Sequence, residues 1–158
     1  MVASRNRSAR SRAALALVGL LALAGCVANA TGPARTTGTY SHKAAATAAV
    51  ASSAVATASM AAQSGADDHA TFPYLSVLVA DAEDTLGSAS STFASIQPPS
   101  TEADAIRAEL TSMLDEAADT VSEARVAIRR GDRTPLADLA DTLRSQADGL
   151  SEFEDGHR

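Results

Sequence analysis

The sequence predicts a small all-α protein, an antiparallel bundle of three or four helices. Three observations lead to this prediction. Apolar residues make up 46% of the 158 residues, yet aromatics are only 3% and alanine is the largest part of the apolar share. Alanine and leucine are strong helix formers. No stretch alternates apolar and polar residues as a half-buried strand does, whereas several stretches repeat apolar residues at helical spacing.

The first regular stretch begins at Pro73, which suits the first turn of a helix because the missing N–H costs nothing there. Pro98 and Pro99 end it. Its apolar positions step alternately by four and three residues, the spacing of a helical seam packed on a neighbour: Leu75, Val79, Ala82, Leu86, Ala89, Phe93 and Ile96. Phe72 and Tyr74 flank the proline, where they form either a hydrophobic staple or a partner contact.

Two more helices follow after short connections, which favours antiparallel neighbours. Ser100 or Thr101 is expected to cap the second helix, and Gly131 to end it. Pro135 suits the first position of the third. The apolar positions of the second helix are Ile106, Leu110, Met113, Leu114, Ala117, Val121, Ala124 and Ile128. Those of the third are Leu136, Leu139, Leu143, Ala147, Leu150 and Phe153.

Residues 41–64 are rich in alanine, and their structure is left open by the pattern. The larger apolar residues Val50, Val55 and Met60 are five apart, a spacing that drifts around a helix. Alanine favours a helix, while the many Ser and Thr residues dilute that preference. The segment is either a fourth helix of the bundle or a low-complexity stalk.

The N-terminal 25 residues have the layout of a secretory signal peptide, with four arginines followed by a short apolar run from Ala13 to Ala24. Twelve residues are too few for a permanent transmembrane helix, which needs about 20. The run ends in Leu23, Ala24, Gly25 and Cys26. This tetrad resembles the lipobox of bacterial lipoproteins. The resemblance implies that Cys26 receives a diacylglyceryl group, with fatty acyl chains such as palmitate, and that a peptidase cuts before it.

Three segments are therefore expected: a signal peptide over 1–25, a lipid anchor with a flexible tether over 26–40, and a helical domain over 41–158. Cys26 is the single cysteine, so no intramolecular disulfide is available. The layout is similar to small helical lipoproteins of high-GC Gram-positive bacteria, a likeness that implies no molecular function. It places the mature chain outside the cell, anchored to the outer face of the cell membrane.

Charge is distributed unevenly along the chain. All 19 acidic residues lie at Asp67 or later, and four of the 13 basic residues precede Cys26. The chain from Cys26 onward thus has nine basic and 19 acidic residues, a formal charge of 9 − 19 = −10 against −6 for the whole chain. Such a surface repels nucleic acid and anionic lipid. Nucleic acid is therefore excluded as an expected partner.

The sequence offers little catalytic chemistry. No nucleophile motif or phosphate-binding loop is present, and no enzyme activity or cofactor is expected. Carboxylates share helix faces, as do Glu116, Asp119 and Glu123, but the three regular helices contain no histidine for a bundle metal site. The weak metal candidates are Asp67, Asp68 and His69 in one stretch and His157 near the C-terminus, with Glu154 and Asp155 beside it.

Two functions remain at this point. The first is a non-catalytic, lipid-anchored envelope protein that serves as a binding or accessory module for an unknown protein partner. The second is an extracytoplasmic lipoprotein that binds a ligand or a metal ion through the acidic and histidine-containing stretches.

Overall fold

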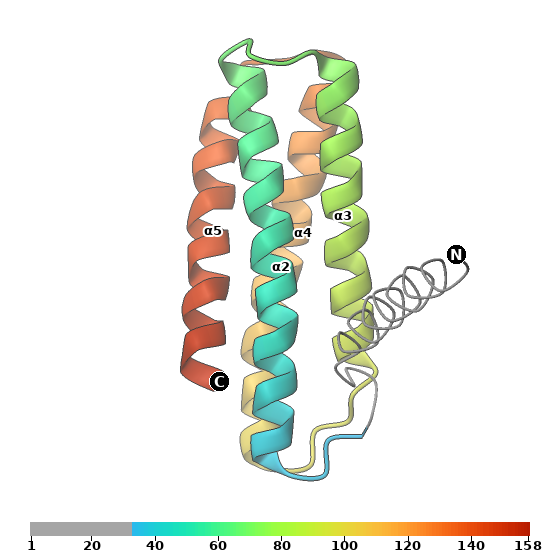
Figure 1. Ribbon diagram of the computed structural model, residues 1–158, viewed down its shortest axis with the longest axis vertical. Helices are drawn as coiled ribbons and strands as arrows, with labels where there is room; N and C mark the ends of the chain where they lie inside the picture. The colour runs from blue at the N-terminus through green and yellow to red at the C-terminus, as the bar shows by residue number, and fades with distance from the viewer. Residues whose placement is uncertain (1–32) are drawn as a thin grey trace, which may run out of the picture. The chain divides into compact units, whose positions relative to one another are not determined.

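The computed structural model describes residues 33–158, and within them the chain is an all-helical, up-and-down bundle (Figure 1). The four helices of this part are α2 (Thr37–Ala66), α3 (Phe72–Ala94), α4 (Thr101–Arg130) and α5 (Leu136–His157). Consecutive helices run antiparallel. Helix α2 packs against all three others, while α3 and α5 do not contact each other. The predicted fold class is confirmed.

The alanine-rich segment is a core helix, so the stalk alternative is wrong. Helix α2 begins at Thr37, and the last four residues of the predicted tether, 37–40, therefore belong to the bundle. Thr36 caps it by accepting a hydrogen bond from the Thr39 amide at 3.2 Å. Tyr40, which is predicted to belong to the tether, is fully buried in the bundle. The remainder of that tether up to residue 32 lies outside the described residues.

The buried face of α2 consists mainly of alanines, with Tyr40 as its one large side chain. Its buried apolar residues are Tyr40, Ala44, Ala45, Ala48, Ala51, Ala54, Val55, Ala58, Ala61 and Ala62. Because alanine side chains extend only a short distance from the backbone, a neighbouring helix can pack close to the α2 backbone. Ser59 shows how near α5 comes: its hydroxyl donates to the backbone carbonyl of Ala140 at 2.7 Å, and it is the one buried polar residue in the described part.

The seams predicted for α3, α4 and α5 face the core. Of the predicted positions, Ala89, Ile106, Met113 and Leu139 are half-buried, and all the others are buried. Ser100 caps α4 by accepting from the Ala103 amide at 3.3 Å, and Gly131 ends α4 in the left-handed conformation with φ of 67°. Pro135 is the residue before α5 rather than its first residue.

By length and composition α2 is the one helix within residues 33–158 that could serve as a signal or a membrane anchor. Its most apolar stretch has a mean hydropathy of 1.4, and half of that stretch is buried inside the bundle. A core helix without charged residues has the same composition. The packing of α2 against α3, α4 and α5 accounts for its apolar character.

Gly65 marks the closest packing at the end of α2. A Cβ at this position would lie 2.8 Å from Cδ1 of Leu136 and 3.1 Å from Cδ1 of Leu75, and both leucines are fully buried. We expect Gly65→Ala to lower the free energy of unfolding by about 1–2 kcal/mol, because overpacking outweighs the gain in helix propensity. Guanidinium denaturation measures the change.

Gly87 provides the matched control, since it lies inside α3 and a Cβ at this position would have no neighbour within 4 Å. Gly87→Ala should raise the free energy of unfolding by about 0.5–1 kcal/mol through backbone entropy alone. If Gly65→Ala stabilised the bundle to the same extent, the close packing described for Gly65 would be wrong.

Tyr40 contributes a buried phenol to the opposite end of the core. Its ring packs on Phe93 with centroids 5.6 Å apart, and its hydroxyl has no hydrogen-bond partner among the described residues. Burial raises the pKa of this phenol above its ordinary value of 10.0; Arg107 lowers the pKa and Asp104 raises it, both to smaller extents. The neutral phenol is therefore the form that the fold favours.

Tyr40→Phe should leave the bundle equally stable or more stable by up to about 1 kcal/mol at neutral pH, because an unpaired buried hydroxyl is removed. Above pH 10 the unfolded phenol ionises while the folded one resists, so the wild-type chain loses stability as pH rises and the variant loses less. Denaturation at pH 8–11 measures the difference. Tyr74→Phe, at a side chain that is 59% exposed, should change neither quantity.

Candidate functional site

The four residues with the most specific sequence signal, Leu23, Ala24, Gly25 and Cys26, lie outside the described residues. The structure does fix where the chain enters the bundle. Helix α2 begins at Thr37, eleven residues after Cys26. The end of the bundle nearest to Cys26 along the chain is thus the end that holds the start of α2, the α3–α4 turn and the C-terminus (Figure 1).

The carboxylate stripes on the helices are exposed to solvent. Glu116, Asp119 and Glu123 on α4 lie on the outside of the bundle, as do the exposed pairs Asp81 with Asp84 on α3 and Asp138 with Asp141 on α5. No carboxylate is buried in the core of residues 33–158. These stripes give the bundle an acidic exterior. They do not point into the core, as the carboxylate ligands of di-metal helical bundles do.

The histidine candidates are separated by the fold. His69 is exposed in the α2–α3 loop, whereas His157 lies in the last turn of α5, at the other end of the bundle (Figure 1). The expectation that the three regular helices contain no histidine is therefore wrong for α5, which extends past its apolar seam to His157. The His157 ring stacks on Phe153 with centroids 4.0 Å apart, and its Nδ1 lies 2.8 Å from the Phe153 carbonyl oxygen. Across residues 33–158, no three His, Cys, Asp or Glu side chains come together at metal-binding spacing.

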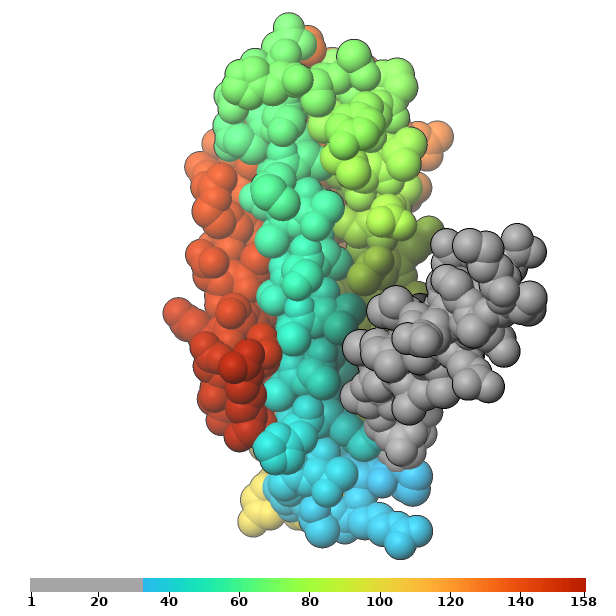
Figure 2. All heavy atoms as spheres, viewed as in Figure 1, coloured from blue at the N-terminus to red at the C-terminus, as the bar shows by residue number. Residues whose placement is uncertain are grey.

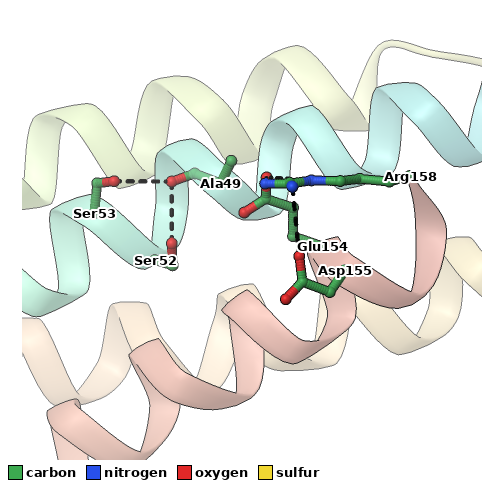
Figure 3. Close-up of polar contacts among 6 residues, drawn as sticks. All are labelled: Ala49, Ser52, Ser53, Glu154, Asp155 and Arg158. Carbon is green, nitrogen blue, oxygen red and sulfur yellow. Dashed lines mark hydrogen bonds and ion pairs between the residues drawn. The ribbon is translucent and has the colours of Figure 1, made fainter.

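The carboxylates beside these histidines have partners within the chain. Asp67 accepts a hydrogen bond from Nε2 of Gln63 at 2.9 Å, and Asp68 pairs with Arg133. At the other end, Glu154 accepts from Nη2 of Arg158 at 2.6 Å (Figure 3). These carboxylates stabilise local structure, and the structure gives no observation that favours the metal-ion hypothesis.

Arg133 joins the two turns at the end of the bundle opposite to the start of α2. Its Nε donates to the Gly65 carbonyl at 3.0 Å, and its guanidinium carbon lies 4.8 Å from the centre of the Phe72 ring. The Phe72 ring in turn lies beside Gly131. Together with Asp68 these contacts tie the α2–α3 loop to the α4–α5 turn. A shallow hollow is lined by Asp68, His69, Ala70, Thr71, Phe72, Pro73 and Arg133.

Arg133 is not among the residues predicted from the sequence. Phe72 is predicted to form a hydrophobic staple or a partner contact, and in the structure its ring is half-buried beneath the Arg133 guanidinium. No local signal points to this role, because the two turns that Arg133 connects are 68 residues apart in the chain.

The outer face of α2 is a second distinctive surface, since residues 44–66 contain no charged side chain. Figure 2 shows side chains of α2 along the front of the bundle between those of α3 and α5. Its hydroxyls bond to the carbonyls of their own helix: Ser52 and Ser53 both donate to Ala49, at 3.1 and 3.0 Å (Figure 3). Shallow grooves follow α2 on either side, toward α3 and toward α5.

In comparisons with known proteins, no protein-family model, no curated protein and no solved structure matches this chain. The function must therefore be inferred from the residues and the geometry.

We expect Arg133→Ala to lower the free energy of unfolding by about 1–2 kcal/mol, because it removes a charge-assisted bond to a backbone carbonyl and a cation–π contact. Urea denaturation measures the loss. Arg144→Ala is the control: within residues 33–158 this exposed side chain pairs only with Asp141 in its own helix, so its removal should cost less than about 0.5 kcal/mol. Equal losses for both variants would show that Arg133 does not hold the two turns together.

Proposed function

We propose that this chain is a non-catalytic, lipid-anchored envelope protein whose helical bundle serves as a binding or accessory module at the outer face of the cell membrane. The observation that carries the proposal is the tetrad Leu23, Ala24, Gly25 and Cys26, which follows a short apolar run and a positively charged start. The small residues before the cysteine match the lipobox at every position.

The physical chemistry of the anchor supports the proposal. A diacylglyceryl group on Cys26 provides two acyl chains, and each buried CH₂ contributes about 0.8 kcal/mol. One chain holds a protein only marginally, whereas two hold it stably. Lipidation would also account for Cys26 as the single cysteine of an exported protein, because it requires no second cysteine.

Only a short tether connects the proposed lipid anchor to the bundle. Ten residues, 27–36, separate Cys26 from the first residue of α2. At about 3.5 Å per residue they extend no more than about 35 Å, so the bundle stays close to the membrane that holds the lipid. The acidic exterior is compatible with this position, because it keeps the bundle soluble and away from anionic headgroups.

The bundle supports a binding role better than a catalytic one. Its carboxylates are exposed, and the histidines His69 and His157 lie at opposite ends of it. Catalysis needs a nucleophile, a base and an orienting group within mutual reach. The surfaces that distinguish this bundle are instead its uncharged α2 face and the arginine-containing end that Arg133 organises.

The anchor is tested by mass spectrometry of the mature N-terminus after membrane fractionation. The wild-type chain should begin at a lipid-modified Cys26 and sediment with membranes. Cys26→Ala should abolish both the modification and the membrane association, since the thiol is the acceptor of the lipid. Thr31→Ala, five residues further on, should leave both unchanged.

An unmodified wild-type chain recovered in the medium would overturn the proposal. So would a Cys26→Ala chain that still sedimented with membranes in carbonate wash, because the anchor would then lie elsewhere in the chain.

A further inference from the structure

We draw no further inference here: the strongest candidate, the uncharged outer face of α2 along residues 44–66 with its exposed Val50 and Met60, is for the rest a stripe of small residues, and nothing in the described part of the chain shows what covers it.

Discussion

The close approach of α2 to its neighbours is the constraint on which the bundle depends. The leucine seams of α3, α4 and α5 are sealed from water because α2 packs against all three helices. Alanine at most of its buried positions makes that approach possible, and a larger side chain at any of them would push a neighbouring helix outward. The Ser59 hydroxyl, which reaches the Ala140 carbonyl across the α2–α5 contact, shows how little space remains.

Charge is distributed unevenly over the surface of the bundle. Residues 44–66 of α2 carry no charge, and most of the acidic residues lie on the outer faces of α3, α4 and α5. The free energy of folding therefore comes from an interior of Ala, Leu, Val and Phe. The exposed ion pairs, such as Arg144 with Asp141, contribute little to it.

Much of the fold could be predicted from the sequence because α3, α4 and α5 carry large apolar residues at helical spacing. For α2 the sequence does not decide between a bundle helix and a stalk, because its larger apolar residues do not mark the buried face: Val55 is buried, but Val50 and Met60 are exposed. Its true seam consists of alanines, which hydrophobic periodicity detects poorly. Arg133 could not be predicted at all, since its partners Gly65 and Phe72 become neighbours only when two distant turns meet.

Polar side chains fasten the turns at both ends of the bundle. At the end where α2 begins, Arg107 donates to the carbonyls of Ala94 and Ile96 at the end of α3, and the hydroxyls of Thr37 and Ser100 meet at 2.9 Å. Arg158 pairs with Glu154 there (Figure 3). Contacts of this kind hold the α3–α4 turn against the start of α2. At the opposite end Arg133 has the same role, because its guanidinium joins the α2–α3 loop to the α4–α5 turn through the Gly65 carbonyl and the Phe72 ring. The long seams of the bundle are thus closed at both ends by side chains that reach from one turn to another element, and the sequence pattern of a single helix does not reveal such contacts.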